Sequence, residues 1–303
     1  MCDRSARFGL SVCRCGYAVW MPLPAAAIDL HCHSRASDGQ LSPTELLDLA
    51  AAQGVQRLAL TDHDTVAGLA EAGAAAARHG IELIPAVELS VTWERRTLHV
   101  VGLQIDTQAP ALTAGLAKLQ DARQERAQAM AERIEKAGVA DAWSRLQAIT
   151  PGAQPTRTHM ARLLVESGLV KDMKQAFKRY LGAGKPAYVR AEWASLREAI
   201  NWIHAAGGLA VLAHPMRYPM TANWRERALR AFKEAGGDAM EVCSGACLRP
   251  EVEQATRLAQ KFELLASVGS DFHGPEQHWL QLGRLAPLPP ALTPVWSQLR
   301  GAI

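Results

Sequence analysis

Histidine and acidic side chains end several short apolar runs in this 303-residue sequence. His31 and His33 end the first run, and because side chains two positions apart on a strand share a face, both imidazoles can reach one ion. Later runs end in the other members of the set, which are His63, Glu88, His214, Asp271 and His273. In a barrel of alternating strands and helices, the carboxyl ends of the strands meet at one rim. We therefore expect these residues, although far apart in the sequence, to converge on one site.

Two more side chains extend this set. Asp38 lies on the loop just beyond the first apolar run. His99 stands at the start of its run rather than at the end, so its place depends on the local fold. If residues 87–105 form a hairpin that turns at Arg95-Arg96, the register returns His99 to the glutamate that ends the third run.

The mixture of imidazoles and carboxylates in this set is suited to divalent metal ions. Imidazole binds manganese, iron and zinc alike, while carboxylates can bridge two ions and offset their repulsion. Nine candidate ligands are too many for one ion. Ions roughly 3.5 to 4 Å apart can lower the pKa of a shared water and bind the oxygens of a phosphate during in-line displacement. The set therefore predicts hydrolysis of a phosphate ester.

The apolar runs predict the strands of an α/β fold. We expect strands at residues 27–30, 57–61, 82–89, 98–105, 209–213, 239–242 and 264–269. Between them lie predicted helices at residues 67–79, 195–206, 222–235 and 250–261. A further helix begins at Ser42, which with Glu45 forms a capping box, and ends near Gly54. This alternation is typical of βα units around a parallel sheet.

The pattern changes in the middle of the chain. From Ala109 to about Ala183 the sequence predicts successive helices without a strand, with breaks at Gly138, at residues 150–155 and at Gly168. We interpret residues 108–190 as a helical insert that caps the substrate. The barrel would then consist of two parts, residues 25–107 and 191–303.

Composition and the amino terminus exclude several classes of protein. A net charge of +3 from 33 basic and 30 acidic groups does not by itself indicate a polyanion-binding surface. No apolar run reaches the roughly 18 to 20 residues of a membrane-spanning helix. The six cysteines suggest neither a zinc knuckle nor a disulfide frame, so we expect reduced thiols in a cytoplasmic protein. Arg14 and Gly16 interrupt the first apolar stretch, which argues against a signal peptide. We expect residues 1–24 to be a tail, either an over-long start or a disordered segment.

Seven motifs together resemble the polymerase and histidinol phosphatase (PHP) family. They are Ile28-Asp29-Leu30-His31-Cys32-His33-Ser34, Ser37-Asp38-Gly39, Leu60-Thr61-Asp62-His63-Asp64, Pro85-Ala86-Val87-Glu88, Leu98-His99-Val100, Ala213-His214-Pro215 and Gly269-Ser270-Asp271-Phe272-His273. The resemblance covers about 25–107 and 190–285. It implies a distorted (β/α)7 barrel that holds three divalent ions, with Mn²⁺ expected and Zn²⁺ or Fe²⁺ as alternatives.

The resemblance also implies how the ligands divide among the ions. The first ion would be held by His31, His33, Glu88 and Asp271. The second would be held by Glu88, His99 and His214, so that Glu88 bridges two ions. The third would be held by Asp38, His63 and His273.

The insert carries its own motif, Thr156-Arg157-Thr158-His159, which is similar to one in stand-alone bacterial PHP phosphoesterases. The family usually has Gly-Arg-Pro-His there, but the arginine and the histidine are kept. Such enzymes act on nucleoside 3′,5′-bisphosphates and, in some members, on the 5′ ends of short RNA. We expect Arg157 of this motif, Lys185 of the insert and Arg217 on the rim loop after His214 to bind substrate, although each could also be an ordinary solvated charge. We expect Glu88, Asp271 and His159 to be catalytic. For His159, a role as leaving-group acid and a role in helix packing both stay open.

Other conspicuous residues have plainer interpretations. Asp62 and Asp64 flank a ligand, and we expect them to orient imidazoles rather than to bind an ion. Trp143, Trp193, Trp202 and Trp224 could stack on bases, but aromatic residues at helical positions more often pack in cores. Cys243 and Cys247 are better explained as incidental thiols than as a metal pair.

These observations predict a phosphatase that removes the 3′-phosphate of a nucleoside 3′,5′-bisphosphate. An exoribonuclease that releases 5′-mononucleotides from short RNA uses the same chemistry on a larger substrate. A histidinol phosphate phosphatase is less favoured because the insert is of the nucleotide type, and the intact ligand set counts against a non-catalytic, metal-stabilised PHP module. We expect a nucleotide as ligand, with short RNA as a second possibility, and neither a membrane nor a stable protein partner.

Overall fold

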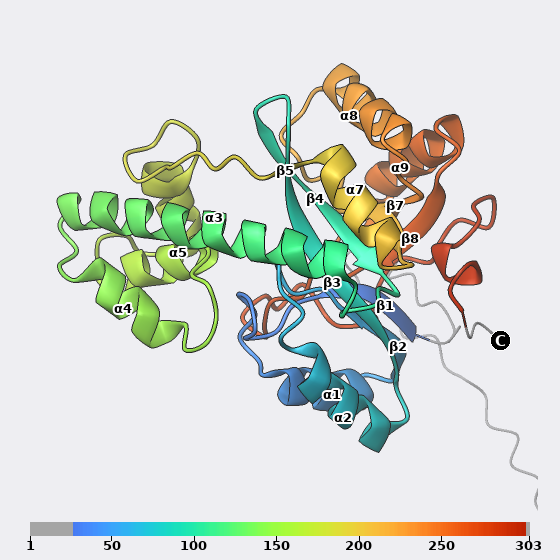
Figure 1. The fold of residues 1–303 in the computed structure, drawn as a ribbon, viewed down its shortest axis with the longest axis horizontal. Coiled ribbons are helices and arrows are strands. Elements are labelled where there is room, and N and C mark those ends of the chain that lie inside the picture. The colour runs from blue at the N-terminus through green and yellow to red at the C-terminus, as the bar shows by residue number, and fades with distance from the viewer. Residues whose placement is uncertain (1–26, 301–303) are drawn as a thin grey trace, which may run out of the picture.

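The computed structural model describes residues 27–300, and the predicted tail at 1–24 lies outside the described residues. Its main feature is one sheet with the strand order β1-β2-β3-β4-β6-β7-β8 (Figure 1). A bridge between Cys32 and Phe272 joins the two ends of this order, so the sheet is a nearly closed barrel. The α/β barrel predicted from the sequence is confirmed.

The strand bounds agree closely with the predicted apolar runs. The strands are β1 Ala27–Cys32, β2 Val55–Leu60, β3 Glu82–Trp93, β4 Arg96–Leu103, β5 Ala194–Ser195, β6 Leu209–Leu212, β7 Ala239–Ser244 and β8 Leu265–Gly269. Only β5 lies outside the predicted runs; it is two residues long and pairs with β3 next to Val91.

The predicted hairpin is present and distorts the barrel. β3 and β4 pair in antiparallel fashion with Ser90 opposite His99, and β4 is also antiparallel to β6. The turn lies at Glu94 and Arg95, one residue earlier than predicted, and both have positive φ angles of 47° and 63°. Two successive left-handed residues match the twist of the flanking strands.

The helices before and after the segment between β4 and β5 pack against the sheet (Figure 1). They are α1 Pro43–Ala52, α2 Leu69–His79, α7 Leu196–Ala205, α8 Ala222–Glu234 and α9 Arg249–Lys261. The predicted capping box starts α1, since the Ser42 hydroxyl accepts from the backbone N–H of Glu45 and the Glu45 carboxylate accepts from that of Ser42. The outer face of the β3–β4 hairpin packs against α7 through a buried cluster that includes Leu89, Leu98 and Ile203.

The chain between β4 and β5 is helical. Its elements are α3 Pro110–Lys136, α4 Ala142–Ile149, α5 Arg157–Glu166, α6 Met173–Ala176 and the π-helix η1 Phe177–Leu181. The first half of α3 packs on the barrel through Leu112 and Leu119, whereas the second half joins a separate core through Met130 and Ile134. Figure 1 shows α3 extending from the sheet to the other helices of this segment. A single long helix therefore fixes the helical segment beside the barrel.

The end of the described chain packs against the inner core of the barrel. The 3-10 helix η2 Val295–Ser297 places Val295 in the inner core with Leu30 and Val211. None of the helices that the structure describes is long and apolar enough to cross a membrane.

Candidate metal centre

All nine predicted ligands lie together at the rim of the barrel. His31 and His33 point to one place, since their Nε2 atoms are 3.1 Å apart. Four overlapping groups have ligand atoms close enough to share an ion: His33, Asp38, His63 and His273; His31, Glu88 and His214; His31, His33 and Asp271; and His63, Glu88 and His99. The side chains that the strand ends predict to converge therefore do lie together, and their role as metal ligands stays a prediction.

Glu88 lies at the centre of these groups. Its Oε1 is 3.3 Å from His31 Nε2, 3.0 Å from His99 Nδ1 and 3.1 Å from His214 Nε2. Its Oε2 is 2.8 Å from His63 Nδ1. Each oxygen of this buried carboxylate faces a different set of imidazoles, which is the arrangement that a bridge between two ions needs.

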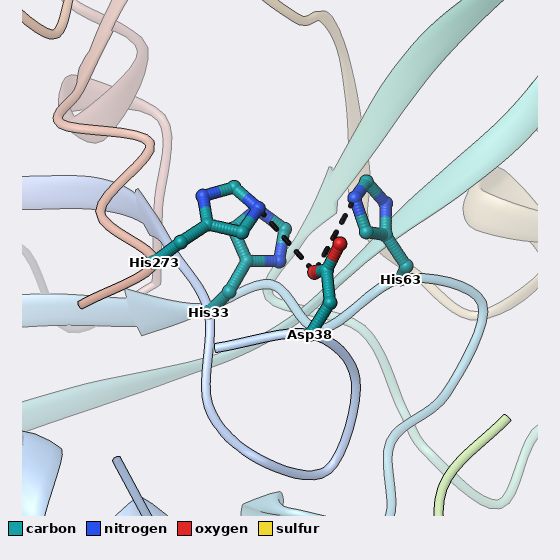
Figure 2. A group of neighbouring side chains, drawn as sticks. All are labelled: His33, Asp38, His63 and His273. Atoms are coloured by element: carbon teal, nitrogen blue, oxygen red, sulfur yellow. Dashed lines mark ion pairs between the residues drawn. The ribbon is translucent and has the colours of Figure 1, made fainter. Parts of the chain in front are cut away.

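Asp38 is the centre of a second group, drawn in Figure 2. Its Oδ1 lies 3.3 Å from His273 Nε2 and 3.8 Å from His63 Nε2. The ring of His33 stacks on that of His273, with centroids 4.1 Å apart. This group approaches the first through His33 and His63, so one continuous site contains all nine side chains.

The charges at this site support metal binding. Burial would raise the pKa of Glu88, but the charges of His31 and His99 hold it well below its usual range. Burial, reinforced by His273, lowers the pKa of His33 to about 3. Nδ1 of His33 has no hydrogen-bond partner among the described residues, and Nδ1 of His63 and of His99 lie 2.8 and 3.0 Å from Glu88 without hydrogen-bond geometry. Buried nitrogens without such partners next to ionised carboxylates are what a site for divalent cations presents.

Two of the ligands have strained backbones. His214 has φ 31° and Asp271 has φ 56°, values that non-glycine residues adopt at a cost of order 1–3 kcal/mol. His214 stands two residues beyond the end of β6, and Asp271 stands two residues beyond the end of β8. Surrounding contacts must hold them there.

Neighbouring carboxylates fix the ligand loops. Asp62 accepts hydrogen bonds from the hydroxyls of Ser34 and Ser37, both at 2.6 Å, and so holds the loop that leads to Asp38. Asp64 accepts from the Ser90 backbone at 2.7 Å and pairs with Arg123 of α3 at 2.5 Å. Neither aspartate forms a hydrogen bond or ion pair with an imidazole of the described residues, so the expectation that they orient histidines is wrong; they anchor backbone, hydroxyls and the helical segment.

A buried glutamate that the sequence analysis missed does contact imidazole. Glu241 of β7 lies 2.5 Å from His31 Nδ1, and it accepts from the His214 backbone N–H at 2.7 Å. Burial would raise the pKa of Glu241, but His31 holds it below its usual value. A charged residue inside the apolar run of residues 239–243 is the signal that could have revealed it.

The helical segment reaches the metal centre through Thr156. Its hydroxyl donates to Asp38 Oδ2 at 3.0 Å, and its backbone N–H donates to His159 Nδ1 at 3.1 Å. His159 thus closes the N-terminal cap of α5. Burial lowers its pKa to about 4, so its imidazole is neutral at pH 7. This geometry favours the packing role for His159, and its role as an acid stays a prediction.

A small pocket between α3 and α5 adjoins this contact. Its lining includes Thr156, Trp193 and three arginines, Arg123, Arg126 and Arg157. Arg126 and Arg157 form no ion pair among the described residues, whereas Arg123 pairs with a carboxylate. Burial, with Arg157 and Arg123 nearby, lowers the pKa of Arg126 to about 9. Cations without counterions in a partly buried pocket are suited to an anion.

The other two predicted substrate residues lie in different surroundings. Arg217 stands on the rim, where Nη1 is 2.7 Å from Asp271 Oδ2. Lys185 is exposed on the loop after η1 and has no ion pair among the described residues. Arg217 is therefore at the metal centre, while Lys185 has no contact that links it to the site.

A model of the PHP domain matches residues 29–192 of the chain, more than half of its length. This chain belongs to the PHP family. The match includes the first strands, with ligands from His31 to His99, and the helical segment.

Similar PHP proteins cover nearly the whole chain. A Haemophilus influenzae protein named 5′-3′ exoribonuclease is 49% identical over 270 residues, which are 89% of this chain and 98% of that protein. A Chromobacterium violaceum protein named 3′,5′-nucleoside bisphosphate phosphatase is 48% identical over 279 residues, 92% of this chain and 98% of its own. A solved structure of an amidohydrolase from C. violaceum, with bound sulfate and no metal, has a TM-score of 0.85 and 48% identity over 90% of this chain and 95% of that one.

The remaining conspicuous residues pack rather than form further PHP ligand sets. Trp193 covers Arg123 and Arg126, with guanidinium carbons 5.2 and 5.6 Å from its ring centroid. Trp224 packs edge-on against Trp93 on the outer face of the hairpin. In the part of the chain that the structure describes, no ligand group includes a cysteine.

Proposed function

We propose that this protein removes the 3′-phosphate of nucleoside 3′,5′-bisphosphates to give the nucleoside 5′-monophosphate and phosphate. It is a hydrolase of phosphoric ester bonds, active in the cytoplasm. The proposal rests on the position of a pocket lined by Arg126 and Arg157 beside the nine candidate ligands. Thr156 connects the two, because it lines the pocket and its hydroxyl donates to the candidate ligand Asp38. One phosphate would be cleaved at the ligands while a second is bound by the guanidinium groups of Arg126 and Arg157, since the pocket itself has room for only about one water. The similar phosphatase from C. violaceum supports the same substrate.

Three divalent ions, with Mn²⁺ expected, would be held by the nine ligands. When bound, such ions polarise the phosphate and lower the pKa of the attacking water. Glu88 and Asp271 would act as catalytic residues because both carboxylates lie beside His31 Nε2, at 3.3 and 3.5 Å. Arg217 contacts Asp271 from the rim, and its guanidinium would bind oxygens of the 3′-phosphate.

The pocket between α3 and α5 would anchor the 5′-phosphate. The sequence predicts Arg157 in this role, and the structure adds Arg126 beside it. Arginine's planar fork can bind two oxygens of a phosphate. Burial, with Arg157 and Arg123 nearby, lowers the pKa of Arg126 to about 9, and a bound anion would stabilise its charged form. Lys185 is exposed and would at most contact the outer part of a substrate.

The second candidate is a 5′-3′ exoribonuclease on short RNA. The exoribonuclease from H. influenzae is as similar to this chain as the phosphatase is. Both reactions break the bond between phosphorus and the 3′ oxygen of a nucleotide whose 5′-phosphate is anchored. They differ only in what is attached to the far side of the cleaved phosphate. The complete ligand set gives no support to a non-catalytic module.

The test measures released phosphate and released mononucleotides with the manganese-loaded protein. Its substrates are nucleoside 3′,5′-bisphosphates, 3′- and 5′-mononucleotides, 5′-phosphorylated dinucleotides and histidinol phosphate. We expect the highest kcat/KM with the bisphosphate. Preference for histidinol phosphate would refute the proposal, and release of mononucleotides from dinucleotides at a higher kcat/KM would favour the exoribonuclease.

The anchor is tested by Arg157→Ala. Loss of a charge-assisted contact should reduce kcat/KM for the bisphosphate by about 2–3 kcal/mol in transition-state binding. The matching 3′-monophosphate, which lacks the anchored group, should be cleaved almost as well as by the wild type. Lys174→Ala is the control, because Lys174 is an exposed cation of the same helical segment without an ion pair among the described residues. Equal losses on both substrates would contradict an anchor at Arg157.

A further inference from the structure

Glu241 contacts two predicted metal ligands without belonging to any ligand group of the described residues. Its side chain is 2% exposed and lies inside the barrel, in the middle of β7. One oxygen is 2.5 Å from His31 Nδ1, and the other accepts from the backbone N–H of His214 at 2.7 Å. The hydroxyl of Ser244 donates to the same oxygen. Three donors therefore surround one buried carboxylate.

These contacts determine how His31 faces the site. Because Nδ1 bonds Glu241, the other ring nitrogen, Nε2, is the atom that lies 3.3 Å from Glu88 and 3.5 Å from Asp271. The two nitrogens lie on opposite edges of the imidazole, so Glu241 cannot reach an ion bound at Nε2. A carboxylate on the far nitrogen of a ligating histidine fixes its tautomer and ring orientation.

The contact with His214 has a different effect. The backbone of His214 has φ 31°, in the left-handed region, and the bond from its N–H to Glu241 helps to hold the chain there. In this conformation Nε2 of His214 lies 3.1 Å from Glu88 Oε1. One side chain thus orients a ring from β1 and a strained residue after β6 toward the same oxygen.

We propose that Glu241 is a positioning residue that pre-organises His31 and His214 for the two ions that share Glu88. The inference rests on the metal centre proposed above. It excludes the third group, because Glu241 has no contact with Asp38, His63 or His273. Removing Glu241 should therefore weaken two ions and leave the third in place.

If Glu241 had a purely structural role, it would stabilise the pairing of β6 with β7. Asp238 provides a control for this alternative. Asp238, three residues earlier, accepts from the Ala210 backbone at 2.7 Å and from His204 Nε2 at 2.8 Å. This carboxylate makes the same kinds of bond at the opposite end of the two strands, away from all nine ligands. Asp238→Asn therefore perturbs strand pairing without touching the metal centre.

The experiment measures bound Mn²⁺ by elemental analysis after equilibrium dialysis against buffered free Mn²⁺. For Glu241→Gln, the amide cannot accept from all three donors, so we expect two of the three ions to dissociate at about 10–100-fold higher free Mn²⁺ than in the wild type. The third ion should keep its wild-type affinity. Asp238→Asn should bind three ions like the wild type. Ser244→Ala, which removes one of the three donors to Glu241, should show a smaller loss of affinity for the same two ions. This variant tests the inference if Glu241→Gln does not fold.

The outcomes separate this inference from the proposed function. Wild-type protein that binds no Mn²⁺ would overturn the metal centre and the inference together. Wild-type protein with three ions beside an unchanged Glu241→Gln would overturn only the inference. Loss of all three ions in parallel, as general destabilisation would cause, would also overturn it.

Discussion

Replacing Glu88 by glutamine tests the centre of the proposed site. Glu88 is fully buried on β3, and its two oxygens face five imidazoles; besides the four distances given above, Oε2 lies 3.4 Å from His33 Nε2. Glutamine keeps the shape but removes the negative charge and turns one oxygen into a donor. That donor would point at nitrogens or ions that need an acceptor. The change therefore removes the bridge without creating a cavity.

The expected size of the effect follows from the contacts. Breaking a buried charge interaction by removing one partner costs about 3–5 kcal/mol. At about 1.4 kcal/mol for each factor of ten, this is roughly two to three and a half powers of ten in affinity for an ion held by Glu88. Because Glu88 faces two ligand groups, two ions are affected, and turnover should fall by several orders of magnitude. The fold should persist, since strand pairing of β3 does not involve the side chain.

The assay combines metal content with phosphate release from a nucleoside bisphosphate. Glu82→Gln is the matched control, because Glu82 is a carboxylate on the same strand that pairs with Arg57 and is 42% exposed. The control should keep metal and activity, and circular dichroism should show both variants folded. Full metal loading with wild-type turnover in Glu88→Gln would refute the bridging role and the trinuclear assignment with it.

Three further predictions concern stability and pH. Arg123→Met leaves the buried carboxylate of Asp64 without its partner, so the free energy of unfolding measured in urea should fall by about 3–5 kcal/mol. Adding Asp64→Asn should recover part of this loss. An unchanged urea midpoint in Arg123→Met would contradict the pairing. In the metal-free protein, burial opposes protonation of His273, but Asp38 raises its pKa to about 9. Because a metal must displace that proton, the apparent affinity for Mn²⁺ at this group should increase about tenfold for each unit by which the pH increases, up to about pH 9. A dissociation constant that does not change with pH would contradict this prediction. A Cβ added at Gly115 of α3 would overlap the Trp202 ring of α7, so Gly115→Ala should lower the free energy of unfolding by about 1–3 kcal/mol in thermal unfolding. Gly73→Ala on α2 is the control and should leave stability unchanged, because the added Cβ would meet only Leu83 at 4.0 Å.

The sequence predicts which candidate ligands converge because their convergence depends on few facts about the fold. A residue that ends a parallel strand lies at the rim whatever the details of packing, and this places His31, His63 and His214 together. His99 needs one more step, the antiparallel hairpin, and the register that puts it opposite Ser90 confirms that step. Strand ends and local turns are both properties that short segments encode.

Glu241 shows what such patterns leave out. It lies within a strand rather than at an obvious strand end, and its direction follows from alternation: Met240 and Val242 point outward into the core against the helices, so Glu241 points inward. The role of Glu241 depends on which side chains of the neighbouring strands lie level with it inside the barrel. That is a property of the closed sheet rather than of a segment, although a charge at an inward position of an apolar run already indicates a partner inside.

The anion pocket depends on tertiary packing to a still greater degree. Arg126 belongs to a long helix whose polar residues give no periodic sign of a site, and Arg157 begins another helix after two intervening breaks. They meet only because α3 spans both the barrel core and the core of the helical segment, while Thr156 ties the start of α5 to Asp38. Arg123, on the same helix, pairs with Asp64 next to the ligand His63. The same helix therefore contributes a bond to the loop that carries His63 and a guanidinium group, that of Arg126, to the pocket beside Thr156.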